Sequence, residues 1–362
     1  MIDSLASGLE TVAKHLPLLL LPLLLDVVIW LGPRVSFQPL LAWLGDFVAG
    51  DSSPLSLLIV MFVVYLGFPL FSNQEVWQPV LLPLAQNEPG NFEGVSEAIR
   101  GVAQSAPEQY LGVSVMPSMV AGRNAELLPF GYSPPIWQIQ SPIEALLFRL
   151  LLFLAGLILL TVYLAFIAQR VKEGNSSLGW VVRRVPAILL QGIVVLILLM
   201  ALAMAVMFIL GVVLSAIVVL GSMLGGDGAA AFLSAMVVAT VVLIGTWSAL
   251  LMAFTVHGMF MNDRGVFAAM WDSLRVVQWN ASSTFSLFLV IFIVTTAVNY
   301  VRGWLDPGSW WMPVGIVANA FISTGLLAAT FVFFKDRYRY WRELREQLLA
   351  ELERRRVQQN KA

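Results

Sequence analysis

Apolar residues run along most of this chain in long stretches, separated by short polar connections. Five stretches after residue 142 are nearly uncharged, at residues 143–168, 186–220, 230–256, 285–300 and 310–334. A helix needs about 20 apolar residues to cross a bilayer, or fewer when a preceding amphipathic turn contributes. We therefore predict five membrane-spanning helices after residue 142.

The N-terminal segment allows two threadings. Residues 16–31 form a sixth apolar stretch, and the Gly32-Pro33-Arg34 that follows is unlike a signal-peptide cleavage site, so we expect a retained span. A further apolar segment at 54–71 is long enough to be a marginal span. With a cytoplasmic N-terminus the protein has six spans and residues 54–71 do not cross; with the opposite orientation it has seven. We favour six, because the pattern then repeats.

The repeat consists of an amphipathic segment followed by an outgoing span. It is clearest in residues 263–294, where Phe267 and Trp271 share one face of the expected helix and Asp272 and Arg275 fall largely on another. Weaker copies of the amphipathic segment lie at residues 5–15 and 178–185. The predicted fold is therefore an all-α integral membrane protein, a polytopic bundle of about six transmembrane helices with cytoplasmic amphipathic helices and three pseudo-repeated units.

Basic residues predict the orientation, because Lys and Arg gather on the cytoplasmic side of membranes. They are concentrated in the connections at 169–185 and 263–279 and in the tail after Phe334, whereas residues 72–142 are acidic and rich in proline. We expect the tail to be cytoplasmic and the acidic region to be extracytoplasmic. The chain then divides into an N-terminal region of residues 1–71, an outer insertion 72–142, a five-helix bundle 143–334 and a charged C-terminal helix 335–362.

Composition narrows the class of protein further. Of the 362 residues 59% are hydrophobic and only 12% are charged, against roughly 25% charged in soluble domains. The chain has no cysteine, which excludes disulfides, thiolate nucleophiles and Cys-bound metals. No basic arm with interleaved aromatics indicates nucleic acid. The two histidines, His15 and His257, lie near no carboxylate cluster, so we expect no catalytic zinc site. Two imidazoles on different helices could ligate haem or a pigment, but one histidine per cofactor is a minimal signal and we predict no cofactor.

Two ionisable residues inside apolar spans form the candidate site. Asp26 and Arg149 would each lie about a turn and a half below the outer end of a span in the six-span threading, close enough to pair. Charges within a membrane are costly unless they are paired or face a wet cavity. We interpret the pair first as a staple between helices and second as part of a substrate or proton path. In the seven-span threading the two residues cannot meet.

The stretch AAMWDSLRVVQWNASSTFSLFLVIFIV, with its amphipathic helix before a final hairpin, resembles uncharacterised six-span bacterial membrane families. These include the membrane domain attached to some glycerophosphodiester phosphodiesterases. The resemblance covers the first span and residues 143–334. It implies a six-span fold in a bacterial membrane and no catalytic residues, because in those proteins the phosphodiesterase activity belongs to a separate domain.

No arrangement of residues in the sequence predicts catalysis, since neither a GxSxG motif nor a Ser-Lys pair is evident. We expect a non-enzymatic plasma-membrane protein that acts as a scaffold, assembly or lipid-interacting component. Its expected partners are anionic lipid headgroups at the cytoplasmic face and a protein at the outer insertion. The alternative is a transporter or permease component for a small molecule or lipid, which would use Asp26 and Arg149.

Overall fold

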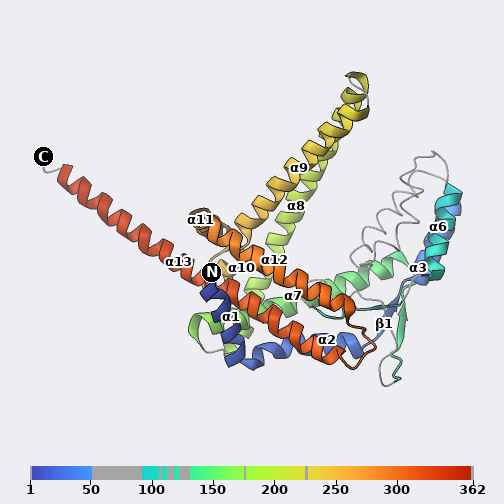
Figure 1. Cartoon of the computed structure of the whole chain (residues 1–362), viewed down its shortest axis with the longest axis horizontal. Coiled ribbons are helices and arrows are strands. Elements are labelled where there is room, and N and C mark those ends of the chain that lie inside the picture. The colour runs from blue at the N-terminus through green and yellow to red at the C-terminus, as the bar shows by residue number, and fades with distance from the viewer. Residues whose placement is uncertain are drawn as a thin grey trace. The chain divides into compact units, whose positions relative to one another are not determined.

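The computed structural model describes residues 2–50, 92–105, 108–111, 118–121, 131–174, 177–224 and 227–359, which are mostly helical (Figure 1). The apolar segment 54–71 and much of the outer insertion lie outside these ranges. Predictions that concern them, including whether residues 54–71 cross the membrane, therefore stay predictions.

Five of the described helices are long and apolar enough to cross a membrane. They belong to α7 (Pro142–Glu173), α8 (Leu178–Leu224), α9 (Asp227–Met252) with the short α10 (Thr255–Met261), α12 (Ala281–Trp304) and α13 (Met312–Gln359). These helices fit the multi-pass helical membrane protein that the sequence predicts.

A sixth candidate is a sharply bent pair at the N-terminus. It consists of α1 (Ile2–Lys14) and the segment Leu16–Leu31, which contains η1 (Leu16–Leu19) and α2 (Leu20–Leu31). Pro17 lies in the first turn of η1, and proline has no N–H to continue a preceding helix. The break at His15 follows from this. The three-fold repeat remains a prediction.

A small sheet adds to the predicted all-helical fold. Its strands are β1 (Arg34–Ser36), β2 (Gln109–Tyr110) and β3 (Ile136–Gln138), in the order β2-β1-β3. The central strand β1 pairs antiparallel with β2 and parallel with β3. Strands of two or three residues carry too little alternation for periodicity to detect, which explains why the sequence did not predict them.

The chain groups into two compact units, each built from separate segments of the sequence. Unit 1 contains Met1–Lys14, Thr161–Ile293 and Gly325–Ala362, and unit 2 contains His15–Leu160 and Val294–Thr324. The boundaries fall inside α7, α12 and α13. The predicted division into residues 1–71, 72–142, 143–334 and 335–362 follows the sequence and not these spatial units. It stays a prediction.

In unit 2, α3 (Gln38–Gly50) lies beside α6 (Phe92–Ser105). Leu41 and Leu44 of α3 pack with Ile99 of α6 in a buried apolar cluster that also includes residues of the sheet. Gly45 allows the close approach, because a Cβ there would lie 2.7 Å from Cγ of Arg100. Helical spacing of apolar residues on both elements therefore produces this core.

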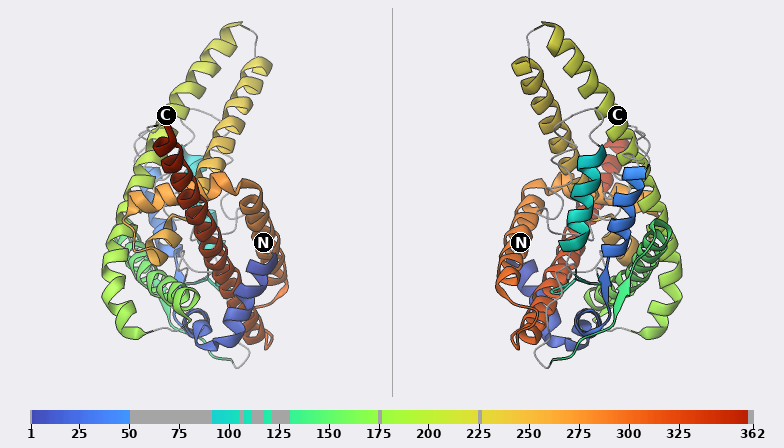
Figure 2. Two further views of the ribbon diagram at one scale, coloured as in Figure 1. Left: turned by 90° about the vertical axis from the view of Figure 1, so that its left-hand side faces the viewer. Right: turned by 90° about the vertical axis from the view of Figure 1, so that its right-hand side faces the viewer.

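In unit 1, residues 325–334 of α13 pack on α1 and on α10. A Cβ on Gly8 would lie 2.5 Å from the backbone nitrogen of Ala329, so this glycine lets α1 approach α13 closely. Phe254, Phe331 and Phe334 are buried together around His257. The helices α8 and α9 run side by side as a hairpin in both views of Figure 2.

The helix α11 (Val266–Trp279) lies in the segment where an amphipathic helix is predicted, and polar side chains belong to its buried face. Asp272 and Ser273 are buried, together with Val276 and Val277, whereas Phe267 and Trp271 are 72% and 55% exposed. Ser273 explains part of this, because its hydroxyl donates to the Leu251 carbonyl and accepts from the Phe254 N–H. The face that packs on protein is therefore the more polar one.

Candidate functional site: a cationic, tryptophan-rich cavity

The predicted site residue Asp26 is 1% exposed and lies in a network within unit 2. Its carboxylate accepts hydrogen bonds from the Ser118 hydroxyl and, at 3.0 Å, from the Met119 N–H. Asn319 lies beside it, and Arg302 is near enough to attract it electrostatically. Arg302 also donates to the Ala121 carbonyl at 2.6 Å.

Arg149, the expected partner of Asp26, is half-buried on α7. The network around Asp26 is built instead from the turn Ser118–Ala121, α12 and α13. Pairing of Asp26 with Arg149 therefore stays a prediction. The Asp26 network ties a turn of the outer insertion to α2, which is a structural role that the sequence did not predict.

The two histidines belong to different units. His15 precedes η1. His257 is buried, with Nε2 2.8 Å from the Thr330 hydroxyl and its ring 4.2 Å from that of Phe331. Close packing by phenylalanine rings and a bond to Thr330 describe a core histidine. Among the described residues, no group of three or more His, Asp or Glu is arranged to hold a metal ion.

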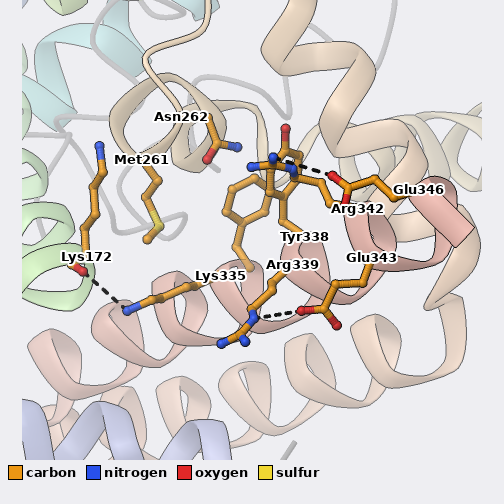
Figure 3. Close-up of a pocket in the computed structure, with 10 residues that line it drawn as sticks. Lys172, Met261, Asn262, Lys335, Tyr338, Arg339, Arg342, Glu343 and Glu346 are labelled. Atoms are coloured by element: carbon orange, nitrogen blue, oxygen red, sulfur yellow. Dashed lines mark hydrogen bonds and ion pairs between the residues drawn. The ribbon is translucent and has the colours of Figure 1, made fainter.

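Two cavities lie along the charged half of α13 in unit 1. Both are lined by Tyr338, Arg342 and Glu346, which recur every fourth residue and so share one face of the helix. The first cavity has a volume of about 330 Å³ and is completed by the ends of α7 and α10 (Figure 3). The second has a volume of about 460 Å³ and is completed by α11 and Arg264.

The charges of the first cavity are largely satisfied by the protein itself. Lys335 donates to the Val171 carbonyl at 2.7 Å. Arg339 pairs with Glu343 at 2.9 Å, as Figure 3 shows. Lys172 lies 3.7 Å from a carboxylate oxygen of Asp263. This cavity therefore offers a ligand few free donors.

The second cavity has an excess of positive charge. Four arginines line it, against two carboxylates: Arg264, Arg275, Arg342 and Arg345 against Asp272 and Glu346. Asp272 lies 3.7 Å from Arg264, and Glu346 lies 3.8 Å from Arg342. Among the described residues, no salt bridge joins Arg275 or Arg345 to a carboxylate. These two guanidiniums keep their N–H groups available for an anion.

Burial changes the titration of Asp272. The residue is 7% exposed, and this desolvation raises the pKa of its carboxyl above the ordinary value, while the charge of Arg264 and the Tyr338 hydroxyl act in the opposite direction. The Tyr338 hydroxyl and, less strongly, the Asp272 carboxylate raise the pKa of Arg264. Arg264, Asp272 and Tyr338 thus form a coupled polar group on the wall of the second cavity.

Tryptophan rings hold the two available arginines. Arg275 lies 5.1 Å from the ring centre of Trp271 and 5.4 Å from that of Trp341, and Arg345 lies 5.7 Å from the Trp341 ring. These distances are those of cation–π contacts, which orient a guanidinium without using its hydrogen-bond donors. Trp341 itself is buried, so it provides a rigid support for both arginines.

The sequence contains a signal for this arrangement that hydrophobic periodicity did not reveal. Both helices carry the pattern Trp-x-x-Leu-Arg, at residues 271–275 of α11 and 341–345 of α13. Four-residue spacing places a tryptophan and an arginine on the same helical face. The expectation that Arg275 falls on a different face from Trp271 is therefore wrong, since the two side chains are in contact. A pattern of this kind on two helices does not show that they meet, and only the structure brings them together.

Apolar side chains flank the cavity where it is open. Leu349 lines it and is 48% exposed, Trp271 also lines it, and Phe267 lies one turn before Trp271 on α11. A charged hollow beside exposed apolar side chains suits an amphiphile better than a fully soluble anion.

The fold places the protein in the class of mostly helical proteins, with five or six described helices that are long and apolar enough to cross a membrane. Comparison with family models, with curated proteins and with solved structures finds no match. The resemblance to the six-span bacterial families therefore stays a prediction.

Proposed function

We propose that this protein is a non-enzymatic, lipid-interacting component of the bacterial plasma membrane, with a cytoplasmic C-terminus. Its binding site for anionic lipid headgroups is the second cavity, between α11 and α13. The observation that carries the proposal is the excess of arginine in this cavity, with Arg275 and Arg345 held on tryptophan rings and not bridged to any carboxylate that the structure describes.

The position of the cavity along α13 supports a headgroup ligand. Residues 312–334 are uncharged and Lys335 is the first charged residue after them. At 1.5 Å per residue, Trp341 lies about 9 Å further along the helix than Lys335, and a tilt brings it closer to the membrane. Headgroups occupy roughly the 5–8 Å outside the hydrocarbon core. Tyr338 and Trp341 therefore fall at or just beyond the depth of lipid phosphates. The backbone of Arg345 lies about 15 Å past Lys335, but its guanidinium is 5.7 Å from the Trp341 ring.

The chemistry of the cavity also suits this ligand. Planar guanidiniums bind phosphate oxygens through two parallel hydrogen bonds, and each basic residue near an anionic surface contributes about 1 kcal/mol. Tryptophan and tyrosine are typical of the membrane–water boundary. The exposed side chains Phe267, Trp271 and Leu349 provide a surface for acyl chains. The same exposed aromatic face of α11 that is unsuited to water is suited to lipid.

The proposal is tested by counting lipids on the full-length protein by native mass spectrometry in detergent. We expect phosphatidylglycerol to be retained in preference to phosphatidylcholine, whose choline cation is repelled by the arginines. The double variant Arg275→Gln/Arg345→Gln should lose most of this preference. Its matched control is Arg183→Gln/Arg354→Gln, which removes the same charge from two exposed arginines outside the cavity. Equal loss in both variants would mean that only overall charge attracts the lipid.

A further inference from the structure

The net charge of the second cavity indicates which kind of phosphate group it would bind best. Asp272 lies 3.7 Å from Arg264 and Glu346 lies 3.8 Å from Arg342, so these two arginines are neutralised most strongly. The charges of Arg275 and Arg345 also act on Asp272, but neither forms a salt bridge with it. Arg275 and Arg345 are left as two positive charges beside the same hollow. An ordinary phospholipid headgroup such as phosphatidylglycerol is a phosphodiester with one negative charge, which would neutralise only one of them.

A phosphomonoester matches this pair of arginines better. It carries between one and a half and two negative charges near pH 7 and has three strongly accepting oxygens. Neighbouring positive charges favour its doubly ionised form. Two guanidiniums with free N–H groups can then each bind two oxygens, as arginine does with phosphate.

The two arginines are also held in place before any ligand arrives. Arg275 contacts both Trp271 and Trp341, and Arg345 contacts Trp341, which is 8% exposed. Fixing a long side chain in its binding position lowers the entropy cost of binding. This favours an anion that binds the arginines where they already lie over a headgroup that would have to displace them.

We propose that the cavity between α11 and α13 selects a phosphomonoester lipid, such as phosphatidate, through Arg275 and Arg345. This inference rests on the proposed lipid-binding function and specifies its ligand. The acyl chains lie toward Trp271 and Leu349, and the terminal phosphate occupies the hollow. A zwitterionic lipid is disfavoured by the excess of arginine over carboxylate, and an anionic diester binds more weakly than a monoester because it lacks the second charge.

The matched ligands for a test are phosphatidate and phosphatidylmethanol with identical acyl chains. They differ by one methyl group, which removes one negative charge from the phosphate. We would measure the affinity of each for the purified full-length protein at pH 8 by microscale thermophoresis with short-chain lipids. The expected result is at least tenfold tighter binding of phosphatidate. Arg345→Gln should reduce this preference to about twofold, and Arg354→Gln should leave it unchanged.

The outcomes separate this inference from the proposed function. Equal affinity for the two lipids, with both lost in Arg275→Gln/Arg345→Gln, would overturn the selectivity but keep the lipid site. Binding of both lipids that survives the double variant would overturn both proposals. A further experiment adds the water-soluble phosphates sn-glycerol 3-phosphate and inorganic phosphate as competitors of the bound lipid. Competition at the same concentration as phosphatidate would assign the site to a soluble phosphate and overturn the lipid assignment.

Discussion

The guanidinium of Arg275 on α11 lies 5.4 Å from the ring centre of Trp341 on α13. This contact joins an amphipathic helix from the middle of the chain to the charged C-terminal helix, and Arg345 contacts the same ring. The lipid site that we propose depends on this ring, because it holds both arginines that form no salt bridge with a carboxylate among the described residues.

Replacing the shared ring should therefore weaken lipid binding. Cation–π contacts contribute about 0.5–1 kcal/mol each at exposed positions, so Trp341→Leu should lower the affinity for phosphatidylglycerol by roughly three- to tenfold. The control is Trp279→Leu, because Trp279 is 64% exposed on α11 and does not line either cavity. Titration of the lipid against both purified variants is the measurement. Unchanged affinity in Trp341→Leu would show that the ring does not organise the site.

Asp272 should make stability depend on pH. Its pKa is raised in the folded protein, chiefly by burial, from an ordinary value of 3.8. Between 3.8 and the raised value the folded state holds a proton that the unfolded chain has lost, so this residue adds stability as the pH falls through that window. Above the window, the buried carboxylate lowers stability.

Asp272→Asn should accordingly be more stable than the wild type at pH 7, with a difference that shrinks toward pH 4. Thermal unfolding of both proteins in the same detergent across this range measures the effect. The variant should also bind phosphatidylglycerol more tightly at pH 7, because one negative charge has left the cavity. A variant that is less stable than the wild type at pH 7 would show that attraction to Arg264 outweighs burial.

The hydrogen bonds of Asp26 should matter for the stability of unit 2. Asp26→Ala removes the acceptor of the buried Met119 N–H and of the Ser118 hydroxyl, and an unsatisfied buried group costs about 1–3 kcal/mol. Asp46→Ala is a suitable comparison, because Asp46 pairs with Arg100 at 2.7 Å but is exposed, and surface pairs contribute about 0–1 kcal/mol. We expect a clearly lower melting temperature only for Asp26→Ala. Similar melting temperatures for Asp26→Ala and Asp46→Ala would show that the hydrogen bonds of Asp26 do not stabilise unit 2.

Gly8 should be intolerant of a side chain. The Cβ of Gly8→Ala would meet the backbone of Ala329 at 2.5–2.6 Å, and overpacking of this kind costs about 1–3 kcal/mol. Gly101→Ala, on α6, places its Cβ where no atom lies within 4 Å and gains up to about 1 kcal/mol of helix propensity. Opposite shifts in melting temperature are therefore expected, and a stabilised Gly8→Ala would rule out the close approach of α1 to α13.

The predicted orientation is testable because the chain contains no cysteine. Ser133→Cys and Gln358→Cys would introduce single thiols at exposed positions, one before β3 and one near the end of α13. An impermeant maleimide added to intact cells should label the first and not the second. Labelling of Gln358→Cys in intact cells would place the tail outside and would reverse the predicted orientation.

Much of the helical framework could be predicted from the sequence, because a long uncharged stretch has few alternatives to a membrane helix. An amphipathic helix was predicted at the start of residues 263–294, and α11 (Val266–Trp279) lies there, because helical periodicity is a local signal. The pattern does not tell which face packs on protein, because apolar residues on a membrane protein pack against lipid as readily as against protein. The hydroxyl of Ser273 and the carboxylate of Asp272 face the protein instead.

The site depends on contacts that no local pattern specifies. Asp26 was found as an intramembrane charge, but its bonds to Ser118 and Met119 come from a distant turn whose sequence gives no indication of them. The cavity needs α11 and the tail of α13 to meet, which periodicity cannot show. The repeated Trp-x-x-Leu-Arg pattern was visible and indicates which faces to compare, though not that they touch.

The proposed lipid site is tested most directly by locating a bound lipid through photo-crosslinking. Phosphatidic acid carrying a diazirine near its glycerol would be added to membranes containing the full-length protein, irradiated, and the modified peptides identified by mass spectrometry. We predict crosslinks in the peptides that contain Trp271–Arg275 and Trp341–Arg345, and their loss in Arg275→Gln/Arg345→Gln but not in Arg183→Gln/Arg354→Gln. Crosslinks spread over the apolar faces of α8, α9 and α12, with neither peptide enriched, would contradict a lipid site between α11 and α13.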